Sequence, residues 1–242
     1  MEQAGRSAAA DNAPDWYWPR WAAQARLPSF EVRDTESSHG RYAEGTKTIT
    51  CKDLVKFHGH ACDGLFRGAL ALSRGLAVLF PDGVIDRTDL RVLSRNSPCL
   101  GDVAAYLTGG RVRFGTQDVR DEPGVWFVVQ RISSGRTVRV AELAGVYPEV
   151  LAAQEAGMVA ERQASPAAVD ALREAQWAWV RDVLLRGSPE AMYPVLELKP
   201  EPWGPVPYAR VGPRTDILFK CVPSHAPWPD RGADGDSEGE AR

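Results

Sequence analysis

The strongest constraint on the fold is an apolar pattern with helical spacing that follows Cys62. Leucine and alanine residues recur at steps of three and four from Leu65 to Leu79. This spacing places them on one side of an α-helix, which must then be buried against another element. The sequence Pro81-Asp82-Gly83 is typical of a turn and should end the helix. The sequence therefore predicts a helix over 63–80 with a single buried face.

Beyond that turn, the sequence predicts short strands and further helices. Leu90–Ser94 is expected to form a strand. Ser97-Pro98 is typical of a helix start, a capping serine followed by proline, and this helix should run to about Leu107. Ser133-Ser134-Gly135-Arg136 predicts a hairpin turn between two β-rich segments. The other expected strands cover 112–119, 125–132, 137–143 and 193–198, and the other expected helices cover 149–159 and 165–185.

These patterns divide the chain into four regions. Prolines recur from position 189 to 213 and prevent long regular elements there. We expect a leader with a Trp-rich extension over 1–48, the core over 49–200, a Pro-rich arm over 201–228 and a disordered acidic tail over 229–242. Four rings of the extension should pack on the core or on a second protomer, or else close over a substrate as a lid: Trp16, Tyr17, Trp18 and Trp21.

Composition excludes several classes of function. The 242 residues carry a formal net charge of −3, so there is no basic excess with which to bind nucleic acid. No apolar run approaches the roughly 18 residues needed to cross a membrane, and the N-terminus lacks the apolar segment of a secretory signal. We expect a cytoplasmic protein whose four cysteines stay free, bind metal or react rather than form disulfides.

Two histidines and a cysteine lie together in FHGHACDG, residues 57–64. In an extended segment the side chains of His58, His60 and Cys62 would share one side, whereas in a helix only His58 and Cys62 would. Neutral imidazole and thiolate are preferred ligands of zinc, so either arrangement suits a divalent metal. The three residues are candidate metal ligands, and the two histidines are the candidate cofactor-binding residues.

Cys62 and Cys99 each stand at the start of an expected helix. The positive end of a helix dipole favours thiolate over thiol, so both sulfurs should bind metal or react. If the two helix starts meet in space, they form a metal site or a centre for redox or sulfur-transfer chemistry. The alternative is that the histidines satisfy backbone groups at a turn and both cysteines are small buried fillers. Arg95, Asn96 and Asp102 flank Cys99 and are candidates to bind an anionic group or orient a ligand in the same pocket.

The motif and its surroundings resemble the FmdE family, which is named after a component of formylmethanofuran dehydrogenase. The segment FHGHACDGLFRGALALSRGL is similar to the family's F-H-G-H-x-C-P-G sequence and the glycine-containing helix after it. SRNSPCLGDVAAYLTGG resembles the family's second segment, in which a cysteine opens a helix that ends in a Leu-Thr pair. SPEAMYPVLEL resembles the segment that closes the family's core, so the likeness covers roughly residues 50–200.

The resemblance implies an α+β fold in which a small antiparallel sheet packs against helices, often in an intertwined homodimer. It also implies a metal, commonly zinc, near His58, His60 and Cys62. Cys99 matches the cysteine of the family's second segment and joins the candidate metal ligands.

The chain departs from the family pattern in three places. Asp63 replaces the usual proline, where a carboxylate would serve as metal ligand, proton carrier or helix N-terminal residue. Gly110 stands where many relatives have a third cysteine. Many relatives also end in a zinc ribbon, whereas this chain offers only Cys221 and His225, too few ligands for a closed structural zinc site.

We therefore expect a metal-dependent enzyme that acts on a small molecule by hydrolysis or group transfer. Zinc, or another divalent transition metal, held by the four candidate ligands would polarise a carbonyl or activate water. The catalytic candidates are Cys62, Asp63 and Cys99, with Asp63 as the nearest general acid or base. One alternative is cysteine-based sulfur transfer or redox chemistry with Cys62 as nucleophile and Cys99 as second thiol. Another is an accessory protein that carries a metal or haem for a partner enzyme.

Overall fold

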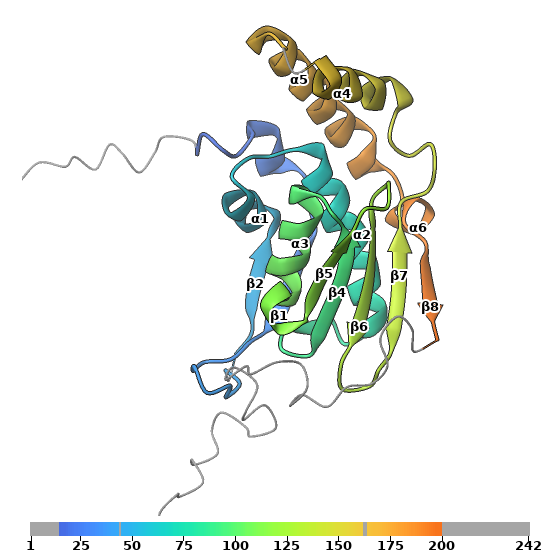
Figure 1. The fold of residues 1–242 in the computed structure, drawn as a ribbon. Coiled ribbons are helices and arrows are strands. Elements are labelled where there is room, and N and C mark those ends of the chain that lie inside the picture. Colours follow the sequence, from blue (N-terminus) through green and yellow to red (C-terminus); the bar gives the residue numbers. More distant parts are fainter. Residues whose placement is uncertain (1–14, 44, 162–163, 200–242) are drawn as a thin grey trace, which may run out of the picture.

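The computed structural model describes residues 15–43, 45–161 and 164–199, which form an α+β fold (Figure 1). The α-helices are α1 (Cys51–His58), α2 (Asp63–Leu79), α3 (Pro98–Thr108), α4 (Glu149–Glu161), α5 (Pro166–Asp182) and α6 (Pro189–Met192). The strands are β1 (Ser29–Arg33), β2 (Lys47–Thr50), β3 (Val84–Asp86), β4 (Leu90–Arg95), β5 (Gln117–Arg120), β6 (Trp126–Arg131), β7 (Thr137–Ala141) and β8 (Val195–Leu198). Short 3-10 helices cover Arg20–Gln24, Val112–Phe114 and Leu184–Arg186. The expected α+β class is confirmed, while the predicted Pro-rich arm and acidic tail lie outside the described residues.

A five-stranded sheet forms one layer of the fold, with the strand order β5-β4-β6-β7-β8. The hairpin predicted at 133–136 is confirmed, because β6 and β7 pair antiparallel with Gln130 opposite Thr137. The sheet is mixed rather than purely antiparallel, since β5 runs parallel to β4 at one edge. The strand expected over 112–119 begins later, because a 3-10 turn ends at Gly115, whose φ is 67°.

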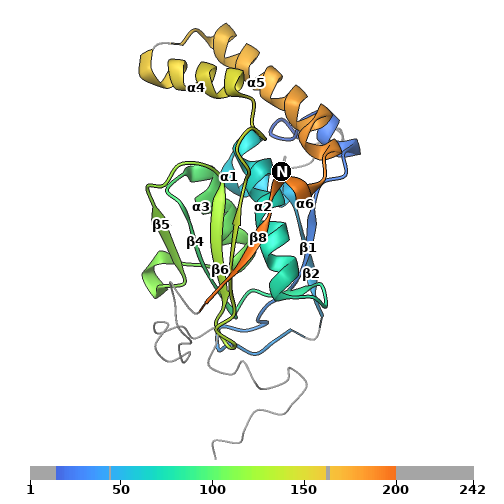
Figure 2. The same ribbon diagram turned by 90° about the vertical axis from the view of Figure 1, so that its right-hand side faces the viewer.

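A second, three-stranded sheet has the order β2-β1-β3. Strand β1 pairs antiparallel with β2 and parallel with β3. Phe30 and Val32 of β1 are buried, and this sheet covers the side of the helices opposite the large sheet (Figure 2). The sequence analysis did not predict these strands, because they are short, contain many polar residues and join segments far apart in the chain.

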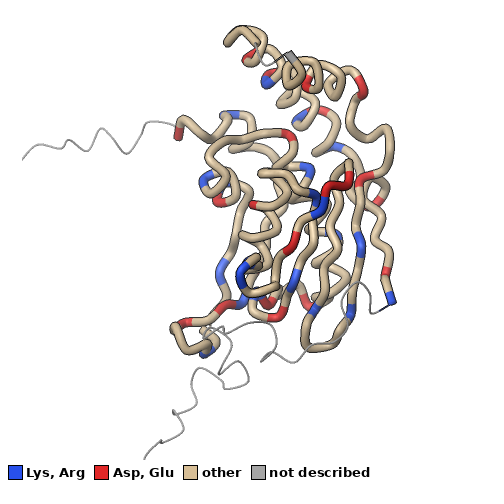
Figure 3. The backbone as a smooth tube through the Cα atoms, viewed as in Figure 1, with Lys and Arg blue, Asp and Glu red and all other residues tan. Residues whose placement is uncertain are grey.

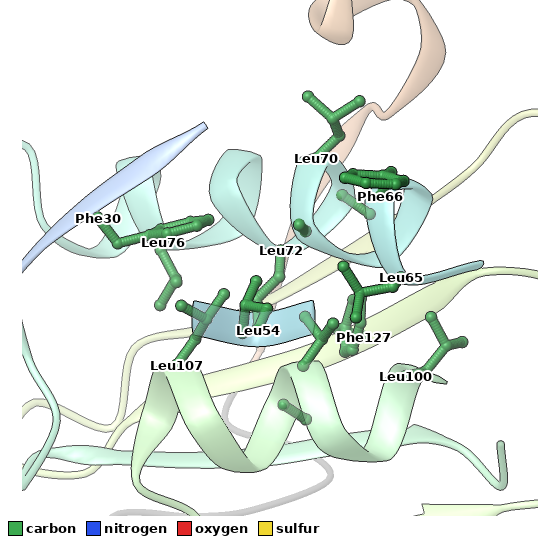
Figure 4. Packing of buried hydrophobic residues seen from close by; sticks show 14 of the residues in the cluster. Phe30, Leu54, Leu65, Phe66, Leu70, Leu72, Leu76, Leu100, Leu107 and Phe127 are labelled. Atoms are coloured by element: carbon green, nitrogen blue, oxygen red, sulfur yellow. The ribbon is translucent and has the colours of Figure 1, made fainter. Parts of the chain in front are cut away.

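Helix α2 lies between the two sheets and forms the centre of the core. Leu65, Leu72 and Leu76 of its predicted apolar stripe are at most 1% exposed. They belong to one buried cluster with Leu107 of α3 and Phe127 of β6 (Figure 4). Burial of each such side chain contributes about 1.5–3 kcal/mol relative to exposure. The helix that the sequence predicted most strongly is therefore also the one that organises the packing.

A glycine in α2 allows α3 to come close. A Cβ atom at Gly68 would lie 2.9 Å from Leu100 Cδ2 in the first turn of α3. A larger residue at this position would displace the Leu100 side chain or separate the two helices. The contact therefore holds the beginnings of α2 and α3 side by side, which decides where the functional residues lie.

Helices α4 and α5 form a helical hairpin that projects beyond the layered core (Figures 1 and 2). This hairpin (149–182) is called the arm from here on and is distinct from the Pro-rich arm predicted over 201–228. Trp179 is buried at the base of α5, where its ring meets Tyr147 with centroids 5.1 Å apart. Trp177 Nε1 donates a hydrogen bond of 3.0 Å to the carbonyl oxygen of Ala61. The arm is thus attached to the core directly above the FHGHACDG segment.

Part of the Trp-rich extension packs on α2. The ring centroids of Trp18 and Trp21 lie 6.5 Å and 5.5 Å from that of Phe66. Trp16, in contrast, is 87% exposed. Packing on the core, one of the arrangements considered from the sequence, therefore describes Trp18 and Trp21.

The surface of the described chain shows no separation of charge by element. Basic and acidic positions are mixed over both the large sheet and the arm (Figure 3). In the same residues, no helix combines the length and apolar character needed to cross a membrane.

Candidate metal centre

The FHGHACDG segment forms a turn between two helices. Helix α1 begins at a capping box, in which Thr50 and Asp53 satisfy backbone N–H groups reciprocally, and it ends at His58. Gly59 follows with a φ of 99°, a left-handed conformation that glycine adopts without strain. Cys62 is then the N-cap residue of α2. The segment is neither extended nor a single helix, the two conformations considered from the sequence.

Three of the candidate ligands converge at this turn. His58 Nε2 lies 3.7 Å from Cys62 Sγ, and Cys62 Sγ lies 3.3 Å from Cys99 Sγ at the start of α3. One donor atom from each of the three residues lies within 4.8 Å of the other two. An imidazole nitrogen and two sulfurs are a donor set that fits zinc or another thiolate-binding transition metal.

His60 is not part of this group of three. It is exposed, and its ring lies against that of His58 with centroids 4.5 Å apart. Partial burial and the neighbouring His58 lower the pKa of His60, which favours the neutral ring. Its role as a metal ligand stays a prediction that lacks the geometric support of the other three residues.

Asp102 fixes the orientation of His58. His58 Nδ1 lies 2.7 Å from Asp102 Oδ2, and the imidazole side chain is only 3% exposed. Because a carboxylate only accepts hydrogen bonds, Nδ1 carries the hydrogen and donates it to Asp102. The lone pair of Nε2 is then free on the side of the sulfurs. A carboxylate behind a histidine in this way is typical of metal sites, where it orients the ring and raises its basicity.

The sulfurs of Cys62 and Cys99 share one proton. The Cys62 thiol donates a hydrogen bond to the Cys99 sulfur, which lowers the pKa of Cys99 to about 7. The same hydrogen bond and the burial of the side chain raise the pKa of Cys62. Above about pH 7 the metal-free pair therefore holds one thiol and one thiolate, and metal binding would release the remaining proton.

A glycine at position 64 makes room for the sulfur pair. A Cβ atom at Gly64 would lie 3.1 Å from Cys99 Sγ, which is tighter than an ordinary contact. Gly110 stands at the opposite end of α3, about 16 Å from its start at 1.5 Å per residue. A Cβ atom there would lie 3.0 Å from Thr108 Oγ1 and 3.1 Å from Gln117 Cβ. A side chain at position 110 would therefore be crowded, and it would not reach the centre in the same chain.

Asp63 takes part in a buried network behind the centre. Its carboxylate accepts a hydrogen bond of 3.1 Å from Arg67, which lies four residues later in α2 and forms an ion pair with it. Arg67 also binds Glu142, at 2.5 Å, and lies over the ring of Tyr147. Tyr193 O–H donates to Glu142 at 3.0 Å. These contacts favour the helix N-terminal role of Asp63, and its role as general acid or base stays a prediction.

A cleft of about 590 Å³ opens beside the sulfur pair and is bordered by the arm. Its lining includes the two sulfur residues, Asp63, His60, aromatic side chains of the extension and several residues of α5. Glu155 of α4 also lines the cleft, where partial burial and the charge of Asp63 raise the pKa of its carboxyl group. The volume lies within the range typical of small-molecule sites, roughly 300–1,000 Å³.

The remaining cysteines have different surroundings. Cys51 is buried, donates a hydrogen bond of 3.5 Å to the carbonyl oxygen of Pro28, and has a pKa raised to about 12 by burial. It is the small buried filler that the sequence analysis offered as an alternative for the other two. Cys221 and His225 lie outside the described residues.

The sequence profile of one known family matches more than half of the chain. The family is described as "FmdE, Molybdenum formylmethanofuran dehydrogenase operon", and the match covers residues 57–190. The chain belongs to the FmdE family. The resemblance inferred from the sequence is thereby confirmed, and the matched range contains the three converging ligands of the FmdE-family chain.

A solved structure is also similar to this FmdE-family chain. It is the crystal structure of a tungsten formylmethanofuran dehydrogenase FmdE-like protein from Syntrophus aciditrophicus, with 17% sequence identity and a TM-score of 0.39. The similarity covers 64% of this chain and 74% of that chain. No curated protein matches the chain.

Sequence analysis named Asp102 as a candidate to bind an anion or orient a ligand near Cys99, but it did not identify His58 as its partner, and it did not name Glu155. Asp102 was grouped with Arg95 and Asn96 as a neighbour of Cys99, but its pairing with His58 depends on the packing of α1 against α3. Asn96 instead donates to Asp121 on the surface. Glu155 carried no signal, because it belongs to an arm whose position over the centre is set by tertiary contacts.

Proposed function

We propose that this FmdE-family protein is a metal-dependent enzyme that acts on a small molecule by hydrolysis or group transfer. The observation that carries the proposal is the convergence of His58, Cys62 and Cys99 donor atoms within 4.8 Å at the edge of a cleft. Three protein ligands beside an accessible space are typical of catalytic zinc sites, whereas structural sites have four.

The surroundings of the three ligands support this assignment. Asp102 holds the His58 ring so that Nε2 faces the sulfurs. The pKa of Cys99, lowered to about 7, supplies a thiolate at neutral pH. A zinc ion bound there would act as a Lewis acid toward a carbonyl or a water molecule. Residues that line the cleft and would hold or move a proton are His60, Asp63 and Glu155.

Metal analysis of the purified full-length protein tests the proposal. We expect about one equivalent of zinc or another divalent transition metal per chain, the number that three ligands of one site imply. A chelator should abolish hydrolysis in a panel of small esters, amides and thioesters, and added metal should restore it. Absence of bound metal, or hydrolysis that persists after complete metal removal, would reject the proposal.

Cysteine-based redox chemistry is a second candidate, supported by the distance of 3.3 Å between the Cys62 and Cys99 sulfurs. In this reaction the two thiols are oxidised to a disulfide while a substrate disulfide is reduced to two thiols. The roles are the reverse of those expected from the sequence, because the pKa of Cys99 is lowered and that of Cys62 is raised. The Cys99 thiolate attacks one sulfur of the substrate and releases the first thiol, and Cys62 then attacks Cys99 to release the second. Activity of this kind survives a chelator and fails after thiol alkylation, which separates it from the metal-dependent reaction.

A homodimer in the cytoplasm completes the proposal. Exposed apolar side chains on the arm support an interface there, with Val150 at 62% and Val159 at 72% exposure. Light scattering of the purified protein would test the mass, and a monomer would reject the dimer. The role as a haem carrier remains a prediction, which the absorption spectrum of the purified protein tests.

A further inference from the structure

One arginine at the cleft has no bonded partner within the described part of the chain. Arg95 is the last residue of β4, where the N–H of Asn96 bonds to the carbonyl of Arg120 and fixes the backbone. The Arg95 side chain is exposed and lines the cleft. No hydrogen bond, ion pair or ring contact with a described residue engages its guanidinium group. Cys99 lies four residues further along the chain, on the same cleft.

The charges of the other two arginines that line the cleft are already paired with acidic side chains. Arg67 is bound by Asp63 and Glu142 at 3.1 Å and 2.5 Å. Arg173 of α5 pairs with Asp170 at 3.1 Å and lies over a tryptophan ring of the same helix. A ligand would have to displace these partners to use either charge. Arg95 is therefore the cation that an incoming anion meets without displacing a bonded partner among the described residues.

Helix α5 supplies an apolar part of the same cleft. Val169, Leu172 and Trp177 line it on successive turns of the helix. The hydrogen bond of 3.0 Å from Trp177 Nε1 to the carbonyl of Ala61 holds the indole ring in place. A fixed ring costs little conformational entropy when a ligand packs on it. The cleft thus combines one available positive charge with a rigid apolar surface.

We infer that the cleft takes a carboxylate-bearing small molecule, with the carboxylate bound by Arg95 and an apolar portion packed against α5. This inference rests on the proposed function, because it assigns the substrate class of the same site. The carboxylate anchors the molecule at the end of β4, next to the start of α3. Its reactive part then lies beside the sulfur pair.

The charge balance of the cleft favours a carboxylate over a phosphate. Arg95 offers a single positive charge and a planar fork that matches two carboxylate oxygens. A phosphate dianion needs a second free cation, and Arg67 and Arg173 are paired. Glu155 also lines the cleft, where partial burial and the charge of Asp63 raise the pKa of its carboxyl group while the charge of Arg95 acts in the opposite direction. When this carboxyl group is ionised, it opposes a doubly charged ligand more strongly than a singly charged one. A monoanion is the charge that these groups accommodate.

Two alkylating agents that differ in charge test the inference on the full-length chain after removal of any bound metal. Iodoacetate and iodoacetamide attack the same thiolate and release the same iodide, but only iodoacetate carries a carboxylate. We expect the rate ratio of iodoacetate to iodoacetamide at Cys99 to fall about five-fold in Arg95→Gln, from the loss of one nearby charge. The ratio cancels any change in the thiolate fraction of Cys99.

Arg173→Gln is the matched control, because Arg173 lines the same cleft but is paired. It should leave the ratio within about 1.5-fold of wild type, since paired surface charges contribute little. Arg95→Lys keeps the charge and should keep most of the ratio. An unchanged ratio in Arg95→Gln, or an equal fall in Arg173→Gln, overturns the inference.

A second pair of probes tests the apolar portion. Phenylacetate and phenylacetamide share a ring and differ only in charge. Phenylacetate should protect Cys99 from iodoacetamide at a concentration about five-fold lower than phenylacetamide does, and Arg95→Gln should remove this difference. Equal protection by both, or protection by neither, overturns the inference. These measurements use metal-free protein, so they are independent of the metal analysis that tests the proposed function.

Discussion

Three cysteines of the described chain stand at helix starts, yet only two of them belong to the candidate site. Cys51 is the first residue of α1, Cys62 is the N-cap of α2 and Cys99 is the second residue of α3. Cys51 is 1% exposed and has a pKa raised to about 12 by burial. The other two contact each other beside the cleft, and the pKa of Cys99 is lowered to about 7.

The difference shows that a helix start alone does not activate a thiol. At the start of α1 the backbone N–H groups of Thr50 and Asp53 are already bonded, because these two residues form a capping box. The starts of α2 and α3 have no side-chain cap. Their sulfurs are also hydrogen-bonded to each other and lie next to the His58 ring. What distinguishes the site is the meeting of two uncapped helix starts with an oriented imidazole.

The largest expected difference between the cysteines concerns metal binding, and it should appear when one metal ligand is removed. Cys62→Ser and Cys99→Ser should lose the bound metal, because two remaining donors are too few for a stable site. Cys51→Ala, the matched control, should keep the wild-type metal content, since its sulfur bonds only to a backbone carbonyl. Elemental analysis of the three purified variants measures the effect. Equal metal contents in all three would contradict the assignment of the site.

Thiol reactivity should separate the two kinds of helix start in the metal-free protein. The thiolate is the attacking form, so iodoacetamide should modify Cys99 at least about a thousand-fold faster than Cys51 at mildly alkaline pH. Because its pKa is lowered to about 7, the rate at Cys99 should rise with pH through a midpoint near 7 and fall away below it. Cys51, with a pKa raised to about 12, should gain no reactivity over this range.

Peptide mapping by mass spectrometry gives both rates in one experiment. As a control, Cys51 should react readily under denaturing conditions, where the fold no longer buries its thiol. Similar rates at the two cysteines of the folded chain would show that their environments do not differ in the way described.

Loss of the carboxylate behind His58 should have an intermediate effect. Asp102→Asn removes a charged acceptor from Nδ1 and should weaken metal affinity by about 10- to 100-fold. Asp118→Asn is the control, because Asp118 is an exposed carboxylate on β5. Competition with a chromophoric chelator measures the affinity. A value for Asp102→Asn equal to that of the control would exclude an orienting role for this residue.

The smallest expected effect concerns the space beside the sulfurs. Gly64→Ala should crowd Cys99 Sγ, only 3.1 Å from the new Cβ, and lower metal affinity several-fold. Gly101→Ala in α3 meets nothing within 4 Å. It should stabilise its helix by up to about 1 kcal/mol without changing metal affinity. Thermal unfolding and chelator competition test both variants. A metal affinity of Gly101→Ala that is lowered as much as that of Gly64→Ala would refute the steric explanation.

Local signals in the sequence were enough to predict the central elements of the fold. The apolar stripe from Leu65 to Leu79 and the Ser97-Pro98 start each specify one helix without help from distant residues. The small sheet depends on long-range pairing, such as Val32 with Ile85, which no local pattern reports. A Thr50–Asp53 capping box preceded α1 and was the available signal for a helix that ends at His58.

The candidate site could be predicted only in part, for the same physical reason. The residue types and the two helix starts pointed to Cys62 and Cys99 as partners, but the distance between them depends on how α2 packs against α3. The spacing of two between His58 and His60 suggested equivalent ligands. Gly59 turns the chain between them, so that only His58 faces the sulfurs, and the left-handed backbone that does this was not anticipated.

The hydrogen bond from Trp177 to the carbonyl of Ala61 ties the arm to the peptide immediately before Cys62. A ligand that moves α5 therefore also moves the backbone that presents one of the metal ligands. Linkage then requires that metal changes the affinity for that ligand by the same factor as the ligand changes the affinity for metal. Binding of an ion at the metal site and binding of a ligand in the cleft then affect each other, and the Trp177 side chain connects the two sites.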